Sequence, residues 1–265
     1  MHEGDSEGPA FDDDRSLSDE DQIEPNALTS ALRGLFLLGE DPYLTMQVTN
    51  LSIIDTWLTG LEGDLLRLHA RRDGTQLAEA MFLSAQSQMW IFAAYELLRT
   101  WRARAKDTLK LAKNGGLPLK IADLRKDVGF QHINREIRAD LLARAEADPS
   151  LLELLGVDLR RTHIVFARME ALRVSLAKHE VLGRPNMMAY APGYARINSF
   201  TGSMQFEVSA GRNIYDVISR RDLADELRAV ADGEPPSEIE LERFDKMLDQ
   251  VFSGSFDDAE QTDDI

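Results

Sequence analysis

The sequence predicts a mainly α-helical fold: a helical bundle of four long helices, with a short β-hairpin insertion and two shorter C-terminal helices. Leucine and alanine are frequent among the 265 residues and aromatic residues make up only 7%, a usage that favours helices. Hydrophobic residues recur at intervals of three and four over long stretches. Clusters of glycine and proline separate these stretches and mark the ends of the predicted elements.

The first two predicted helices are the longest and span residues 42–72 and 75–106. Asp41 and Pro42 suit the N-cap and the first turn of the first helix. The segment NGGLP at 114–118 breaks the helical pattern after the second. We expect these helices to form an antiparallel hairpin. Because they carry more hydrophobic positions than one partner helix covers, they also predict a homodimer.

The third and fourth predicted helices span residues 121–147 and 159–179. Pro149 closes the third, because the residue before a proline disfavours the helical conformation. Gly183 and Pro185 stop the fourth. With the first two, these helices complete the predicted bundle.

The segment at 186–210 differs in kind and predicts the β-hairpin. Residues 201–202 form a Thr-Gly turn, and hydrophobic residues alternate over 204–208 after it. Two shorter helices are expected at 214–231 and 237–251, separated by a pair of prolines.

The charge distribution divides the chain into three parts. The net charge of -16 comes from an acidic segment at 1–24 (net -9) and another at 232–265 (net -10), which leave +3 for residues 25–231. We expect a disordered acidic tail at 1–24, a helical domain at 25–231, and an acidic helix followed by a disordered tail at 232–265. The tails could compete with nucleic acid for the basic body, contact a protein partner, or keep the protein in solution.

Several classes of site are disfavoured by what the sequence lacks. Without cysteine there is no disulfide framework, thiolate metal site or cysteine nucleophile. The phosphate-binding, dinucleotide-binding, serine-hydrolase and zinc-protease signatures are also missing. His132 and Glu136 have the spacing of a metal pair, but no second pair completes a ligand set. We therefore expect no metal and no cofactor. No hydrophobic run approaches a membrane span, and the expected location is cytoplasmic.

A basic stretch between residues 99 and 138 is the candidate surface for nucleic acid. It holds eleven Lys or Arg residues against four acidic ones. Such a surface could contact phosphates. The alternative is a solvated helix face that keeps the protein soluble. The residues selected as candidate nucleic-acid contacts are Arg99, Arg102, Arg104, Lys106 and Lys110.

Arg173 and His179 stand near the end of the fourth predicted helix, in the segment RMEALRVSLAKHEVLGRP at 168–185. Six steps at about 100° per residue leave the two side chains roughly 120° apart. They converge only where the last turn frays or where a second protomer supplies one of them. The alternatives are an Arg173 that pairs with a carboxylate such as Glu170, and a His179 that caps the helix.

This Arg-x5-His pair resembles the R-x(4–6)-H signature of the HEPN superfamily, helical-bundle proteins that include metal-independent ribonucleases and toxins of prokaryotic defence systems. The resemblance implies that Arg173 stabilises charge on the scissile phosphate and that His179 transfers a proton as the ribose 2′-hydroxyl attacks. Glu96 would orient one of the two, in a site composed across a dimer. The superfamily often has a polar residue after the arginine, where this chain has Val174.

Two functions of different class follow from the sequence. One is a HEPN-like metal-independent endoribonuclease or RNA-binding protein of a bacterial toxin or defence system. The other is a non-enzymatic helical interaction or regulatory protein, indicated by the acidic tails and by Val174.

Overall fold

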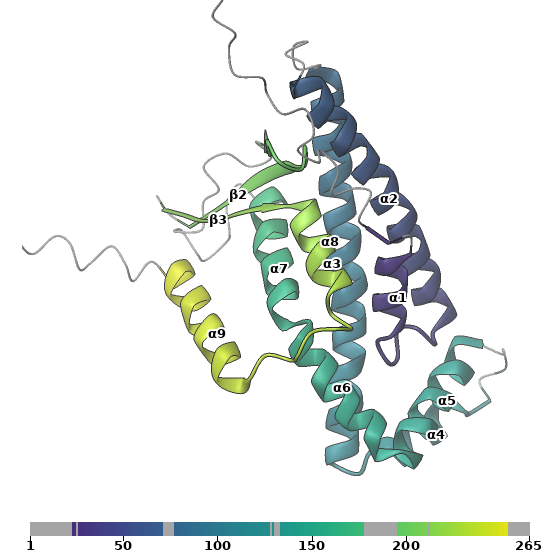
Figure 1. The fold of residues 1–265 in the computed structure, drawn as a ribbon. Helices are drawn as coiled ribbons and strands as arrows, with labels where there is room; N and C mark the ends of the chain where they lie inside the picture. Colours follow the sequence, from purple (N-terminus) through teal and green to yellow (C-terminus); the bar gives the residue numbers. More distant parts are fainter. Residues whose placement is uncertain are drawn as a thin grey trace, which may run out of the picture.

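A computed structural model describes residues 23–24, 26–70, 77–127, 129, 133–177, 195–210 and 213–253. The described residues are mainly helical and include a small antiparallel sheet (Figure 1). The helices are α1 Ala27–Arg33, α2 Pro42–Ala70, α3 Leu77–Lys113, α4 Leu117–Leu124, α5 Ile133–Ala147, α6 Pro149–Arg161, α7 His163–Ala177, α8 Arg220–Arg228 and α9 Glu238–Ser253. The strands are β1 Ala195–Ile197, β2 Met204–Ala210 and β3 Asn213–Ser219.

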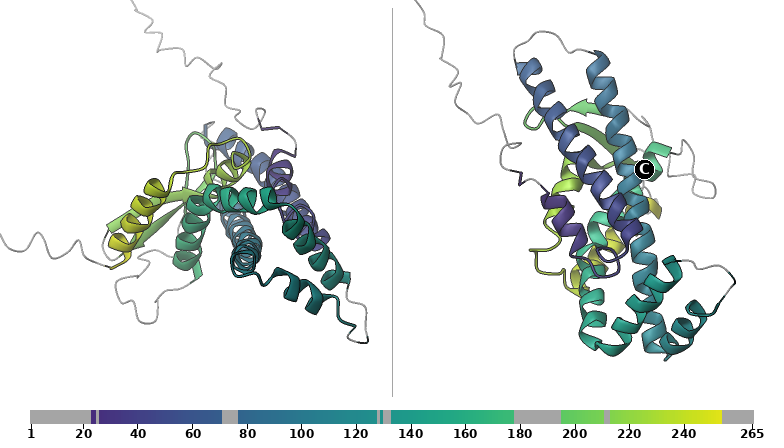
Figure 2. Two further views of the ribbon diagram at one scale, coloured as in Figure 1. Left: turned by 90° about the horizontal axis from the view of Figure 1, so that it is seen from below. Right: turned by 90° about the vertical axis from the view of Figure 1, so that its right-hand side faces the viewer.

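Helix α3 is the central element of the fold. It packs against α2 on one side and against α6 and α7 on the other, and α8 also contacts it. Figure 2 shows α3 nearly end-on in the view from below, with α4 and α5 projecting to one side. Trp101 on α3 is fully buried, and its indole N–H donates to the carbonyl of Phe36 at 2.7 Å. Trp90 donates in the same way to Leu51 of α2 at 3.1 Å.

The helix pair α2–α3 follows the predicted pattern closely. Helix α2 begins at Pro42, and Asp41 accepts hydrogen bonds from the backbone N–H groups of Tyr43 (2.9 Å) and Leu44 (3.1 Å). The predicted N-cap is therefore confirmed. Helix α3 continues to Lys113, seven residues beyond the predicted end, until the glycines that follow Asn114.

The prediction of a single third helix over 121–147 is wrong. Helix α4 ends at Leu124 and α5 begins at Ile133. In the connection Gly129 has a φ of 76°, and its N–H donates to the Asp127 side chain at 2.8 Å. The break lets α4 and α5 fold back on each other. They bury a small core of their own, formed by Leu117, Ile121, Leu124, Ala139 and Leu142.

The fourth predicted helix, 159–179, corresponds to parts of two helices. Helix α6 starts earlier, at Pro149, where Asp148 caps it by accepting from the N–H of Ser150 at 3.0 Å. It ends at Arg161, and α7 begins at His163. Thr162, between the two helices, is buried. Only α2 and α3 are therefore long helices among the described residues. Residues 178 and 179 lie outside the described part of the chain.

The sheet contains one more strand than the sequence predicts. Strands β1 and β2 pair antiparallel, with Ala195 opposite Phe206. Strand β3 then pairs antiparallel with β2, although residues 214–219 were predicted to be helical. The helical segment starts only at Arg220, where Ser219 and Asp222 form a capping box. The part of the predicted hairpin at 186–194 lies outside the described residues.

The β1–β2 turn packs directly against α2. Gly202 in this turn has a φ of 71°, and a Cβ added there would lie 1.9 Å from the carbonyl oxygen of Glu62. Glycine is therefore required twice, by the left-handed backbone and by the close approach to the helix. This contact fixes the sheet against the last third of α2, toward the connection to α3.

The acidic C-terminal helix predicted at 237–251 is α9, whose first turn is closed by Ser237 and Glu240. It contacts α7 through His163 and Asp245, 2.6 Å apart, and otherwise stands away from the bundle (Figure 1). The predicted disordered tails fall almost entirely outside the described residues. None of the helices in the described part of the chain is long and apolar enough to cross a membrane.

Candidate functional site

Arg173 lies on α7 where this helix packs against α3. Its guanidinium carbon is 4.6 Å from the ring centroid of Tyr95, a cation–π contact. The Nε–H of Arg173 is buried and has no hydrogen-bond partner among the residues that the structure describes. An unpaired buried donor of this kind costs free energy unless a further group satisfies it.

Aromatic and charged side chains surround Arg173. The Tyr95 hydroxyl donates to Glu170 at 3.2 Å, and the Tyr95 ring stacks on Phe166 with centroids 5.2 Å apart. Burial raises the pKa of Tyr95, and the neighbouring Glu170 carboxylate raises it further, so the phenol stays protonated at neutral pH. Glu170 therefore bonds to Tyr95, while the Arg173 guanidinium lies on the ring.

The other two residues proposed for this site are not placed with Arg173. Glu96 is exposed, forms an ion pair with Arg99 at 2.7 Å, and lines a hollow between α2 and α3. Arg173 instead occupies the α3–α7 contact, beside Tyr95. His179 lies outside the described residues, so the spatial relation of the Arg-x5-His pair stays a prediction.

Arg102, selected as a nucleic-acid contact, is buried rather than exposed. Its Nη1–H groups donate to the carbonyl of Leu159 at 2.9 Å and to the hydroxyl of Thr162 at 2.5 Å, and its guanidinium lies over the Phe166 ring. Burial lowers the pKa of Arg102 to about 10. This side chain joins α3 to the α6–α7 junction and does not face solvent, where a phosphate would bind.

Five of the eleven basic residues in the stretch pair with carboxylates. Arg104 pairs with Asp41 at 2.6 Å and so holds the cap of α2. Arg125 pairs with Asp140 at 3.0 Å, and Arg138 is 3.3 Å from Asp107. Lys106 and Lys110 are exposed on α3. The predicted surface is therefore a set of local ion pairs with a few open lysines.

A hydrophobic groove runs along the outer face of α2 and α3. Its α2 side consists of residues spaced alternately by three and four: Gln47, Asn50, Ile54, Trp57, Leu61, Asp64 and Leu68. Its α3 side follows the same spacing: Glu79, Phe82, Gln86, Met89, Ala93 and Glu96. We call this set the α2–α3 groove. Alternate spacing by three and four is the heptad pattern of helices that pack on other helices.

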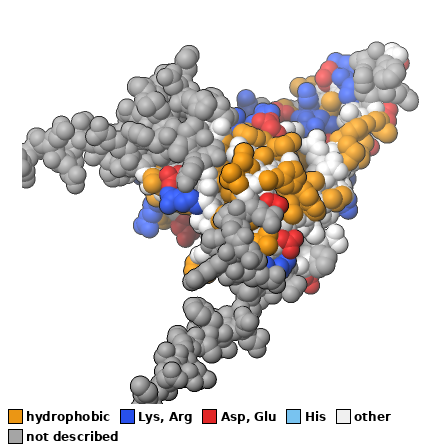
Figure 3. Space-filling model, turned by 90° about the horizontal axis from the view of Figure 1, so that it is seen from above, with side chains coloured by type: hydrophobic (Ala, Val, Ile, Leu, Met, Phe, Trp, Pro, Cys, Tyr) orange, Lys and Arg blue, Asp and Glu red, His pale blue; other side chains and the backbone are white. Residues whose placement is uncertain are grey.

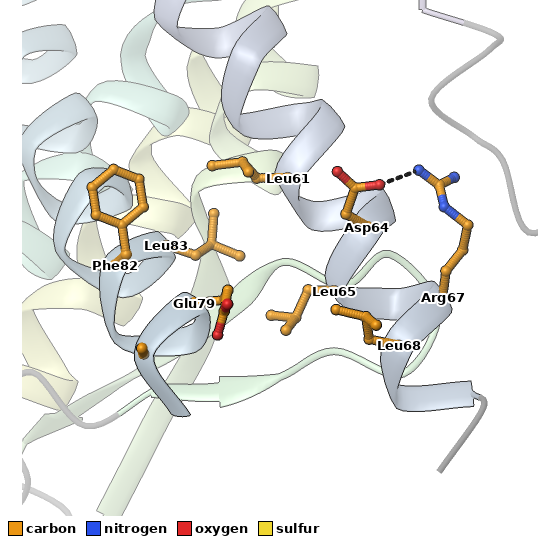
Figure 4. A pocket seen from close by; sticks show the side chains of 9 residues that line it. Leu61, Asp64, Leu65, Arg67, Leu68, Glu79, Phe82 and Leu83 are labelled. Carbon is orange, nitrogen blue, oxygen red and sulfur yellow. Dashed lines mark hydrogen bonds and ion pairs between the residues drawn. The ribbon is translucent and has the colours of Figure 1, made fainter. Parts of the chain in front are cut away.

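The floor of the groove has two hollows. One, of about 410 Å³, lies over Leu51 and the buried Trp90. The other, of about 580 Å³, lies near the end of the hairpin where α2 leads into α3, and there Leu61, Leu65 and Leu68 of α2 face Phe82 and Leu83 of α3 (Figure 4). Trp57 and Phe82 meet edge to face between them, with centroids 5.6 Å apart.

The groove and its flanks leave large hydrophobic side chains in contact with water. They are Tyr43, Met46, Ile53, Ile54, Trp57, Met81, Phe82 and Met89, each 39–63% exposed. Figure 3 shows hydrophobic side chains gathered over a broad area of the face seen from above. Contiguous apolar surface of this extent is typical of interaction sites.

The opposite face of α2 carries charge that sequence reasoning missed. Asp55 and Glu62, two turns apart, are 3% and 0% exposed. Arg220, the first residue of α8, is also fully buried, with its Nε–H 3.0 Å from one Glu62 oxygen and its Nη2 2.6 Å from the other. Arg221 donates to the same carboxylate at 2.9 Å.

Asp55 completes this arrangement, which we call the α8 charge cluster: Asp55, Glu62, Arg220, Arg221 and Arg228. Asp55 pairs with both Arg220 and Arg228. The cluster is closed to solvent, so it acts as a structural joint between α2 and α8 and offers no room for a substrate. The sequence signal was present in two acids spaced by seven and in the SRRD segment at 219–222.

No metal site is evident in the part of the chain that the structure describes, where no three His, Asp or Glu side chains are grouped as ligands. His132, one half of the weak metal pair, lies outside that part. Searches against protein-family models, curated proteins and solved structures found no match for this chain. The assignment of function therefore depends on the site geometry alone.

Proposed function

We propose that this protein is a non-enzymatic interaction protein that binds a helical partner in the α2–α3 groove. The observation that carries this proposal is the pair of heptad-spaced rows, which lie side by side and are open to solvent. Grooves of this kind bind amphipathic helices through side chains spaced by three and four.

The chemistry of the groove supports a hydrophobic partner. Its centre is formed by Ile54, Trp57, Phe82 and Met89, and polar groups are concentrated at its two ends. Methionine side chains adapt to a docked surface, and tryptophan is among the residues that contribute most to binding energy at protein interfaces. Placing these groups in water costs about 25 cal/mol per Å² of apolar surface, which a bound partner recovers.

A photo-crosslinking experiment in cells tests the proposal. A photoreactive amino acid replaces Gln86 in the groove, and the matched control places it at Leu119 on α4, which is 77% exposed. We expect a discrete adduct from position 86 whose cross-linked peptide, identified by mass spectrometry, has hydrophobic residues spaced by three and four. The adduct should disappear when Ile54→Asp is added. An adduct no stronger than that from position 119 would contradict the proposal.

A second function, metal-independent RNA cleavage, is favoured by one specific observation, the buried and unpaired Nε–H of Arg173 beside the Tyr95–Glu170 pair. In this proposal Arg173 binds the scissile phosphate and His179 transfers the proton, as the HEPN resemblance implies. RNA cleavage is measured in EDTA with the wild type, Arg173→Lys and His179→Ala. Both variants should lose at least about 100-fold in rate. Cleavage that survives both changes, or none by the wild type, would refute it.

A further inference from the structure

We infer that the occupant of the α2–α3 groove is a second copy of this chain, whose own α2–α3 pair packs face to face against the first. The result is a four-helix bundle across a two-fold axis. This inference rests on the proposed function of the groove as an interaction surface, and it names the partner.

The exposed area matches what a stable dimer buries. A large side chain has about 150–250 Å² of surface, and the eight hydrophobic side chains of the groove and its flanks are 39–63% exposed. Together they leave about 800 Å² of apolar surface open, close to the ~800 Å² per partner of a standard interface. A single docked helix would cover only the floor between the two rows. It would leave Met46, Ile53 and Met81 on the flanks exposed, whereas a second helix pair can cover them.

The two rows suit a copy of themselves. In a two-fold interface the same surface faces itself, so it must be self-complementary. The α2 row and the α3 row have the same alternating spacing, so each can receive the side chains of the other in the manner of a helical bundle. In the dimer, each row therefore packs against a row with the same spacing.

The charges at the two ends of the groove do not oppose such a dimer. At one end Asp64 is paired with Arg67 at 2.8 Å, and at the other Glu96 is paired with Arg99 at 2.7 Å. The first end thus holds two acids, Asp64 and Glu79, with one arginine, and the second holds one acid with one arginine. An arginine is therefore present at each end in either orientation of the second copy. The paired arginines could exchange partners across the interface.

The acidic N-terminal segment is a poor occupant by comparison. Residues 1–24 hold ten acidic residues and lack any heptad spacing of hydrophobic residues. Such a segment cannot fill two hydrophobic hollows. A second copy therefore fits the groove better than this part of the same chain does.

Sedimentation of the full chain tests the inference. We expect the wild type to be a dimer at micromolar concentration, and Ile54→Asp or Met89→Asp to weaken association by about 100-fold, as buried anchors do. Leu119→Asp is the matched control, because it changes an exposed hydrophobic residue on α4 in the same way. Far-UV circular dichroism verifies that each variant stays folded.

The absence of cysteine permits a direct second measurement. A single nitroxide label attached to Gln86→Cys is the only label in each chain, so any dipolar coupling arises between two copies. We expect strong, short-range coupling at position 86, which Ile54→Asp removes. A label at Leu119→Cys should give a longer distance.

The outcomes separate this inference from the proposed function. A monomeric wild type whose position-86 adduct contains another protein overturns self-association and leaves the groove as an interaction site. A monomer without an adduct overturns both. A dimer that neither Ile54→Asp nor Met89→Asp weakens, or whose label at position 86 shows no short distance, overturns the inference because the chains then associate elsewhere.

Discussion

The two faces of α2 reverse the usual distribution of polar and hydrophobic residues. The inner face, toward α8, holds Asp55 and Glu62, both buried. The outer face holds Ile54 and Trp57, which are 39% and 46% exposed. The inner charges are tolerated because arginines of α8 satisfy them, whereas nothing among the described residues covers the outer face completely. Residue type alone therefore does not reveal which side of α2 faces the core.

One residue, Trp90, links the α2–α3 groove to the α8 charge cluster. Trp90 of α3 lines the floor of the α2–α3 groove, and the guanidinium carbon of Arg220 lies 5.7 Å from its ring centroid. Trp90 further donates to the Leu51 carbonyl of α2. The α8 charge cluster therefore supports the groove from behind, and changes on the inner face should affect folding while changes on the outer face should affect association.

The largest expected effect comes from removing the central arginine of the inner face. Arg220→Met leaves Glu62 and Asp55 buried with too little counter-charge, and the free energy of unfolding should fall by about 3–5 kcal/mol. Urea denaturation measures it. The control is Arg99→Met, which breaks an exposed ion pair and should leave the free energy of unfolding nearly unchanged. Equal losses in the two variants would show that the buried cluster contributes no more than a surface pair.

Gly202→Ala tests how tightly the β1–β2 turn is held against the inner side of α2. The new Cβ would clash with the Glu62 carbonyl and would sit in a left-handed backbone. We expect a loss of about 2–4 kcal/mol. The control is Gly60→Ala, because a Cβ added at Gly60 would meet no atom within 4 Å. This variant should gain up to about 1 kcal/mol of stability through helix propensity. Thermal unfolding of both variants provides the comparison.

Asp158 on α6 contrasts with Asp55 and Glu62, because hydrogen bonds and ion pairs do not fully satisfy its buried carboxylate. One of its oxygens is buried and has no partner in the described part of the chain, and burial raises the pKa of Asp158 despite the opposing charge of Arg161. The folded state thus binds the proton more tightly than the unfolded state does. The ionised carboxylate costs stability above the folded pKa, and this cost disappears as the pH falls below the unfolded pKa of about 3.8.

Asp158→Asn should therefore be more stable than the wild type at pH 7, and the difference should shrink as the pH is lowered. Urea denaturation between pH 4 and pH 7 follows it. A difference that stays constant or grows toward acid pH would contradict burial as the dominant cause. We expect a smaller change than for Arg220, because Arg161 lies 3.6 Å from the other oxygen of Asp158.

The smallest effect on folding is expected on the outer face. Met89 is 63% exposed, so Met89→Gln should change the free energy of unfolding of the monomer by no more than about 0.5 kcal/mol. Leu58, fully buried on α2, is the comparison: Leu58→Ala should cost about 2–5 kcal/mol. Chemical denaturation at nanomolar concentration avoids any contribution from association. A large loss for Met89→Gln would mean that this residue belongs to the core.

The sequence by itself determined the local elements. Helix α2 was predictable because its N-cap residue Asp41, its proline at the first turn and its spacing by three and four all act within a few residues. The same spacing along 42–72 and 75–106 also predicted more hydrophobic positions than one partner helix covers. Helix α2 and its cap at Asp41 can therefore be predicted from short-range rules.

Tertiary structure decided which face of each helix is used and which distant residues meet. Glu62 and Arg220 are 158 positions apart, and neither residue type reveals that the other will satisfy its buried charge. The same holds for Glu96 and Arg173, which the sequence grouped in one site and the structure separates onto different sides of α3. The strand β3 likewise exists because β2 supplies its hydrogen bonds. Local propensity depends on neighbours along the chain, whereas burial and pairing depend on neighbours in space, and only the folded chain fixes those.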